Sequence, residues 1–165
     1  MYILFSLCRQ CTGVSSSSSL ATFGTCFSVT ECRSKGGSAD GNCAAGFGVC
    51  CTFLANTCGS TVYNNNTYVQ NPSYPSSYTT TGSCEYSVLP CNSHICQLRL
   101  DLDHFDLTDN VVGGACTDSF DVTVGSSRHY YSLCGTNSGY HSKYSELSNK
   151  RKHGIIVTLG KYGQN

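Results

Sequence analysis

The chain has 165 residues, with ten Lys and Arg against ten Asp and Glu, 13 Cys, 17 Gly, one Met and no Trp. This balanced charge gives no net field that would favour nucleic acid or an anionic membrane surface as a partner. Thirteen dispersed cysteines indicate an oxidising compartment, which excludes a cytosolic protein and predicts secretion. No apolar run reaches about 18 residues, so we expect no membrane span.

The first ten residues open with a short apolar run, Met1 to Leu7. It carries no basic residue and is short for a signal peptide. We therefore expect residues 1–10 to be a leader remnant or a disordered start.

Residues 11–53 hold six cysteines and few large apolar side chains, so this small module needs disulfides to fold. The adjacent Cys50 and Cys51 should not bond each other, because disulfide geometry is strained across one peptide unit. They must reach two different partners, and six cysteines allow fifteen pairings. The six are Cys11, Cys26, Cys32, Cys43, Cys50 and Cys51.

The cysteine doublet and the entry Gly24-Thr25-Cys26 resemble the clip module found ahead of arthropod serine proteases. Clip modules are docking and regulatory appendages without chemistry of their own. The resemblance implies the pairs Cys11–Cys50, Cys26–Cys43 and Cys32–Cys51.

The region after Cys58 begins with turn and strand signals. Asn71-Pro-Ser-Tyr-Pro75 holds two prolines and predicts a turn. The stretch from Cys84 to Val88 alternates apolar and polar residues, which predicts a half-buried strand. Cys91 and Cys96 flank four residues that are typical of a hairpin loop.

The stretch from Cys96 to Leu107 is the strongest strand signal in the chain. Its apolar residues alternate with polar ones up to Leu102, and the phase slips by one residue at His104 before Phe105. Strict alternation predicts a strand with one face on a core, and the slip predicts a bulge or bend at its end.

Three further strand signals follow. Asp118 to Val124 places Phe120, Val122 and Val124 on one face; Leu133-Cys134-Gly135 closes another strand; and Ile155, Val157 and Leu159 predict a last one. Short strands, frequent turns and no convincing helical period predict an all-β protein, an antiparallel β-sandwich.

This region resembles the CUB domain. The motifs that carry the resemblance stand in its order: Cys58-Gly, Asn71-Pro-Ser-Tyr-Pro, Tyr78, Cys84-Glu-Tyr, Leu100 through Phe105-Asp-Leu107, Cys116, Asp118 and Leu133-Cys-Gly135. The resemblance implies a jelly-roll-like β-sandwich with the bridges Cys58–Cys84 and Cys116–Cys134. Cys91 and Cys96 are additional to the usual four, and we expect them to pair with each other.

Many CUB domains bind ligands through a calcium ion held by one Glu and two Asp. Asp118 matches one of these positions, but Thr108 stands where the Glu is expected, with Asp109 beside it, and the late Asp has no counterpart. Calcium takes six to eight oxygen ligands, so we predict no competent site and no cofactor; Asp109 and Asp118 are the weak candidates. The acidic run from Asp101 to Asp109 has a simpler interpretation as outward residues of a solvated strand.

A CUB sandwich continues beyond the strand of Ile155 to Leu159 into one more strand, whereas this chain ends six residues after Leu159. We therefore expect a CUB domain over residues 58–165 that is truncated and lacks its last strand, with unpaired edges beside the gap. The proposed pairings leave Cys8 over.

Asn65-Asn66-Thr67 is a glycosylation sequon in a polar loop, where we expect room for a glycan on Asn65. No histidine has an evident Ser and Asp partner, so the sequence predicts no enzyme. We expect a secreted, non-catalytic extracellular module that binds a protein. The alternatives are the regulatory front end of a clip/CUB serine protease whose catalytic domain lies outside this chain, and a structural component of matrix or cuticle.

Overall fold

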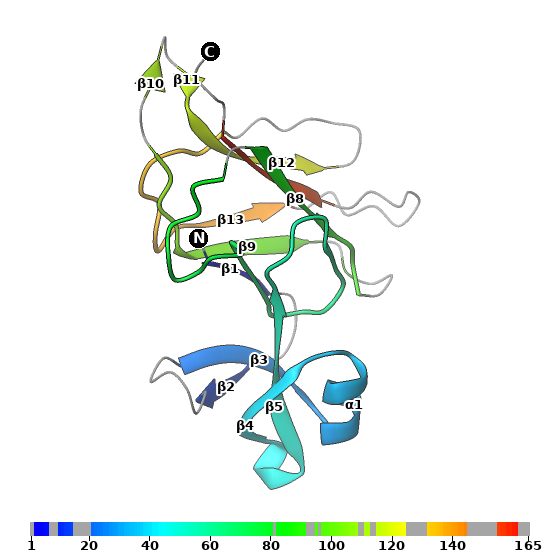
Figure 1. Ribbon diagram of the computed structural model, residues 1–165. Coiled ribbons are helices and arrows are strands. Elements are labelled where there is room, and N and C mark those ends of the chain that lie inside the picture. The colour runs from blue at the N-terminus through cyan, green and yellow to red at the C-terminus, as the bar shows by residue number, and fades with distance from the viewer. Residues whose placement is uncertain are drawn as a thin grey trace.

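The computed structural model (Figure 1) describes residues 2–6, 10–14, 21–80, 82–91, 95, 97–108, 111–112, 115–124, 132–144 and 155–161. Strands dominate these residues, as the sequence predicts. No helix among them is long and apolar enough to cross a membrane.

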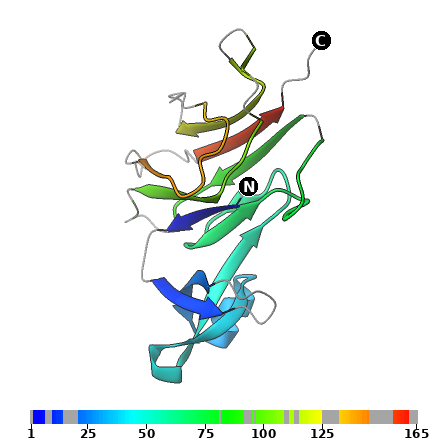
Figure 2. The same ribbon diagram turned by 90° about the vertical axis from the view of Figure 1, so that its left-hand side faces the viewer.

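The described strands form two larger sheets, and the first of them extends downward into a small disulfide-rich module at the bottom of Figures 1 and 2. The first sheet has the order β13-β9-β1-β7-β5-β3-β2, with β4 paired to β5. Its strands are β1 (Tyr2–Ser6), β2 (Gln10–Val14), β3 (Ala21–Phe27), β4 (Ser38–Cys43), β5 (Gly48–Ala55), β7 (Thr67–Gln70), β9 (Leu98–His104) and β13 (His141–Tyr144).

The second sheet has the order β12-β14-β8-β6, and a separate hairpin joins two short strands. The strands of the second sheet are β6 (Thr61–Val62), β8 (Gly82–Val88), β12 (Asp118–Val124) and β14 (Ile155–Lys161), and the hairpin is β10 (Val111–Val112) with β11 (Ala115–Cys116). Most pairs are antiparallel; β5 with β7 and β6 with β8 are parallel.

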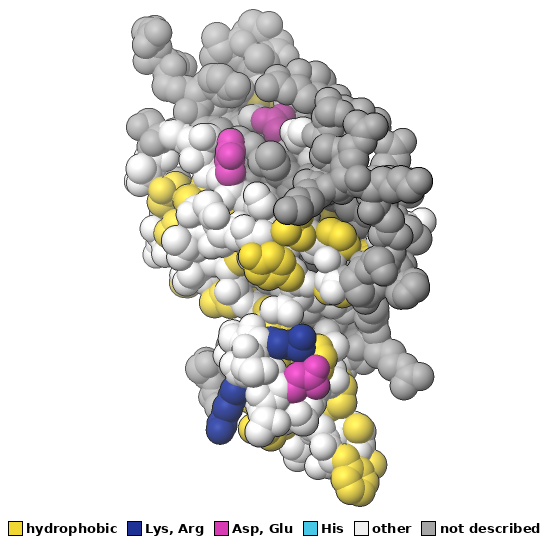
Figure 3. Space-filling view, turned by 90° about the vertical axis from the view of Figure 1, so that its right-hand side faces the viewer, with side chains coloured by type: hydrophobic (Ala, Val, Ile, Leu, Met, Phe, Trp, Pro, Cys, Tyr) yellow, Lys and Arg dark blue, Asp and Glu magenta, His cyan; other side chains and the backbone are white. Residues whose placement is uncertain are grey.

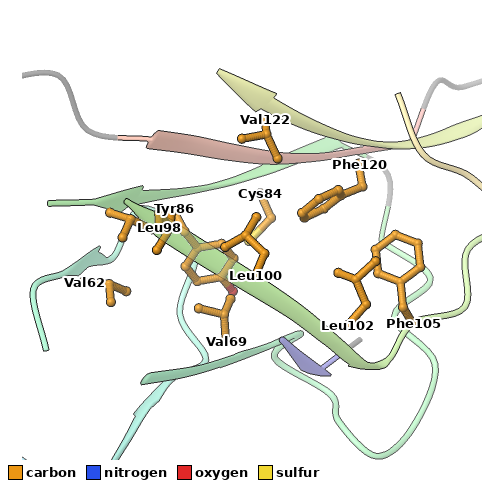
Figure 4. Packing of buried hydrophobic residues seen from close by; sticks show 11 residues of the cluster. Val62, Val69, Cys84, Tyr86, Leu98, Leu100, Leu102, Phe105, Phe120 and Val122 are labelled. Atoms are coloured by element: carbon orange, nitrogen blue, oxygen red, sulfur yellow. The ribbon is translucent and has the colours of Figure 1, made fainter. Parts of the chain in front are cut away.

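The core lies between the two sheets (Figure 4). Strand β9 contributes Leu98, Leu100 and Leu102, which are at most 3% exposed. Opposite them, alternate residues of the second sheet point inward, including Tyr86 from β8 and Phe120 from β12. The remaining buried members are Val62, Val69, Cys84, Val88, Phe105 and Val122. The predicted alternation of the β8, β9 and β12 segments is therefore confirmed where the structure describes their side chains.

The predicted irregularity at the end of β9 is confirmed as well. Tyr2 of β1 pairs with His104 and the next residue, Ile3, pairs with Leu102, so Asp103 is the extra residue of a bulge. The bulge shifts the phase by one residue, and Phe105 is again fully buried.

The first residues differ from expectation. Tyr2–Ser6 is not disordered but forms β1, antiparallel to β7 on one side and β9 on the other. That residues 1–10 are the remnant of a leader stays a prediction. Composition cannot separate a short leader-like apolar run from a strand inside a sheet. The missing last strand of the sandwich stays a prediction.

Two other segments depart from the sequence analysis. Within the described residues 132–144, Leu133 makes an isolated bridge to Phe120, and Leu133–Gly135 does not belong to a strand. A short helix, α1 (Val29–Ser34), was not expected. Its signal is Ser28 three residues before Glu31, because the Ser28 hydroxyl accepts a hydrogen bond from the Glu31 N–H at 3.2 Å.

The small module, here called the knot, comprises β2–β5, α1 and the turn η1 (Ala44–Gly46). Its own core consists of Cys32, Cys51 and Phe53, with Phe27 and Val49 packed against them. Strand β5 serves both parts: Thr25 to Phe27 of β3 pair with its first half, and β7 pairs with its second half. It continues to Ala55, past the predicted end of the module at residue 53.

Candidate functional site

A pocket of about 490 Å³ opens at one end of the sandwich. Its wall is the loop after β7, and its floor comes from the ends of three strands, β8, β9 and β12. The residues that line it are Asn71, Tyr74–Thr80, Gly82, Cys84, His104, Asp106, Leu107, Thr108, Asp118 and Thr136.

The predicted turn at Asn71–Pro75 builds the wall. The Asn71 side chain is 9% exposed, and its Oδ1 accepts a hydrogen bond from the Ser73 N–H at 2.9 Å. Tyr74 donates its N–H to the Asn71 carbonyl at 3.1 Å, which closes the turn. The Tyr74 ring meets His104 edge to face, with 6.3 Å between ring centroids, so the wall is held against the end of β9.

The chain after β9 forms the floor. Phe105 donates its N–H to the Ser138 hydroxyl at 2.9 Å, and that hydroxyl in turn reaches the Phe105 carbonyl at 3.1 Å. One residue on, Asp106 accepts a hydrogen bond from the Thr136 hydroxyl at 2.9 Å. These bonds fix the Asp106 carboxylate at the edge of the pocket.

Asp118, the first residue of β12, contributes the second carboxylate. Its Oδ1 atom is buried and has no hydrogen-bond partner among the described protein atoms. A buried carboxylate oxygen without a partner is costly, so this atom favours a bound hydrogen-bond donor. No Lys or Arg is among the described residues that line the pocket, which is therefore acidic.

The described residues do not fit a calcium ion. They contain no group of three or more His, Cys, Asp or Glu side chains that could hold a metal. Asp106 is already bonded to Thr136, and Thr108 brings no carboxylate. Asp109, the other candidate, lies outside the described residues. The absence of a competent calcium site stays a prediction.

Among the described residues there are five disulfides, and they join five of the six cysteine pairs expected from the sequence. In the knot they are Cys11–Cys50, Cys26–Cys43 and Cys32–Cys51. In the sandwich they are Cys58–Cys84, under the pocket wall, and Cys116–Cys134, just before Asp118. The sixth expected pair is Cys91–Cys96, and its Cys96 lies outside the described residues. The leftover Cys8 lies outside them as well.

The expected room for a glycan at Asn65 is corrected. Asn65 is only 8% exposed, and its side-chain nitrogen donates to the Thr25 hydroxyl at 3.5 Å. The next residue, Asn66, is fully buried and donates to the Gly24 carbonyl at 2.7 Å. The polar segment is a hydrogen-bonded junction between sandwich and knot rather than an open loop, and a glycan on Asn65 would displace β3.

Part of the pocket was not predicted from the sequence. Asp106 is exposed, as expected of an outward residue, but it also lines the pocket. Asp101 on β9 is less exposed and pairs with Arg99 at 2.6 Å. Tyr74 was predicted only as part of a turn, and Tyr78 only as one of the motifs that resemble a CUB domain. Neither was predicted to line a pocket.

Comparison with known protein families identifies the region that forms the sandwich and its pocket. The sequence matches the CUB domain family over residues 58–157, more than half of the chain. No curated protein and no solved structure gives a significant match. CUB domains are generally non-catalytic modules that mediate protein interactions, and a CUB domain with many disulfides is typical of extracellular proteins. The chain belongs to the CUB domain family.

Proposed function

We propose that this protein is a secreted, non-catalytic extracellular module that binds a partner protein by taking one of its basic side chains into the acidic pocket. The observation that carries the proposal is the buried, unpartnered Oδ1 of Asp118. A Lys or Arg head group donates several hydrogen bonds and supplies the opposite charge.

The other lining residues support the same ligand. Asp106 adds a second carboxylate, and Tyr74 and Tyr78 give the pocket aromatic surface. Aromatic faces attract cations, and a long basic side chain also covers apolar surface with its methylene stem. The proposal therefore uses both the charge and the aromatic lining.

The clip-like interpretation of residues 11–53 is also a proposal. Its support is that the three disulfides of the knot join the cysteines that the resemblance implies. In this reading the knot is a second docking element beside the CUB domain, in a secreted protein of the arthropod clip/CUB type.

The pocket is tested by NMR titration of the oxidised chain with acetyl-lysine-methylamide and, as the uncharged control, acetyl-norleucine-methylamide. We expect the lysine probe alone to shift the amide signals of Asp118 and Thr136, with weaker binding at higher salt. Asp118→Asn should abolish the shifts, whereas Asp101→Asn, outside the pocket, should leave them unchanged. Equal shifts with norleucine, or full binding by Asp118→Asn, would overturn the proposal.

A further inference from the structure

The turn η1 and the following Phe47 form the end of the knot farthest from the sandwich, the cyan turn at the bottom of Figure 1. Phe47 is 93% exposed. Burying a phenylalanine side chain is worth about 1.5–3 kcal/mol, and here that stabilisation is forgone in a module with a very small core. The exposed ring is therefore a feature that folding of the chain does not require.

The backbone beneath the ring is strained. Ala44, Ala45 and Gly46 all have positive φ values, 50°, 54° and 93°. The left-handed conformation costs a residue with a Cβ roughly 1–2 kcal/mol, and it persists only where the surrounding structure imposes it. Strain of this kind concentrates at ligand-contacting sites, so it is an observation independent of the exposure of Phe47.

One disulfide braces both flanks of the turn. Cys43 ends β4 immediately before Ala44 and is bonded to Cys26. After Phe47, a Cβ added to Gly48 would lie 2.9 Å from the Cys26 sulfur and 3.0 Å from the Cys43 sulfur, so this disulfide packs directly against the chain. A turn already held in this way loses little conformational freedom when it binds.

The turn is also uncharged. No Lys, Arg, Asp or Glu occurs from Asn42 to Val49. In Figure 3 hydrophobic atoms stand at the lower end of the molecule, and the charged side chains visible on that face lie above them. A single aromatic ring without basic neighbours is a poor anchor for a bilayer. The acidic pocket of a second copy, with Asp106 and Asp118, does not complement it either.

We propose that Ala44–Phe47 is a rigid docking knob whose Phe47 ring inserts into an uncharged apolar pocket of a partner protein. An aromatic anchor that fills a desolvated pocket is how a few residues dominate protein interfaces. The inference is independent of the acidic pocket, which lies in the sandwich, and the knob would give this chain a second binding surface.

The test uses the full oxidised chain with the photo-crosslinking residue p-benzoylphenylalanine at position 47, or at Tyr140, which is 68% exposed on the sandwich, as the control. Each protein is irradiated in extracellular fluid of its source tissue, with unlabelled wild type or Phe47→Ser as competitor. We expect one protein adduct specific to position 47. Wild type should suppress it, and Phe47→Ser should need about 30-fold higher concentration, the equivalent of a 2 kcal/mol anchor.

Because Phe47 is almost fully exposed, Phe47→Ser should melt like wild type. Equal suppression by both competitors, or the same adduct from position 140, would overturn the knob. So would Phe47-dependent flotation with phosphatidylcholine or phosphatidylserine vesicles, or Phe47-dependent dimerisation in sedimentation velocity. Substitution of Asp118 should leave the crosslink intact, which separates this test from that of the acidic pocket.

Discussion

Folding disfavours the ionised form of Asp103, the bulged residue of β9. Partial burial, and secondarily the nearby Asp101 charge, raises the pKa of the Asp103 carboxyl above its usual range. The folded state therefore binds this proton more tightly than the unfolded state, and stability falls as pH rises from the ordinary pKa through the raised one. We expect Asp103→Asn to raise the melting temperature at pH 7 and to converge with wild type below about pH 3, as measured by circular dichroism.

Asp101→Asn is the matched control on the same strand. It removes the bonds from the Arg99 guanidinium at 2.6–3.0 Å, so it should lower stability at pH 7, by up to about 1 kcal/mol. A lower melting temperature for Asp103→Asn than for wild type at pH 7 would contradict the claim that the ionised Asp103 carboxylate destabilises the folded state.

Ala45 offers a second test at the residue scale. With φ 54° and ψ 31° it occupies the left-handed region, which glycine adopts without a Cβ penalty. We expect Ala45→Gly to stabilise by about 0.5–1 kcal/mol, after the entropy of a more flexible unfolded chain is subtracted. Ala39→Gly, in strand β4, should instead destabilise by a similar amount in urea unfolding. Equal losses for both would show that the turn is unstrained.

At the scale of elements, β9 is the strand on which the sandwich depends. It pairs with β13 and β1, and its Leu100 side chain is fully buried. Leu100→Ala should cost about 2–5 kcal/mol, because it leaves a cavity between the sheets, and Leu100→Asp should prevent folding. Leu54→Ala, at a site 56% exposed, should change the unfolding free energy by less than about 0.5 kcal/mol. Similar losses at both positions would be incompatible with this core.

At the scale of the whole molecule, hydrogen bonds join the knot to the sandwich. The Tyr68 hydroxyl of β7 accepts the Phe23 N–H of β3 at 2.7 Å, whereas the Tyr86 hydroxyl donates to the Gln70 carbonyl inside the sandwich. Tyr68→Phe should cost about 1–2 kcal/mol and speed hydrogen exchange at the Phe23 amide. Tyr86→Phe removes a comparable bond but should leave that amide protected. If Phe23 exchange is unchanged in Tyr68→Phe, the hydroxyl does not hold the two parts together.

The sequence by itself determined that the β8, β9, β12 and β14 segments are strands, and which faces of the first three meet the core. Alternation in the β8, β9 and β12 segments is a local property, because successive residues of a strand point to opposite faces whatever its neighbours are. The bulge at Asp103 was visible for the same reason, as a slip of one residue in that pattern. Spaced motifs were also sufficient to indicate the CUB resemblance.

Only the tertiary structure decided which strands become neighbours and which loops meet. The insertion of Tyr2–Ser6 between β7 and β9 has no periodic signal, because a short, mostly apolar run fits a leader as well as a strand. Asn65 and Asn66 have the composition of an open loop, yet they are buried because β3 supplies their hydrogen-bond partners from about 40 residues away. The pocket likewise exists because Tyr74, Asp106 and Asp118, distant in the chain, meet at one end of the sandwich. Such long-range contacts depend on packing between elements, which a local pattern does not encode.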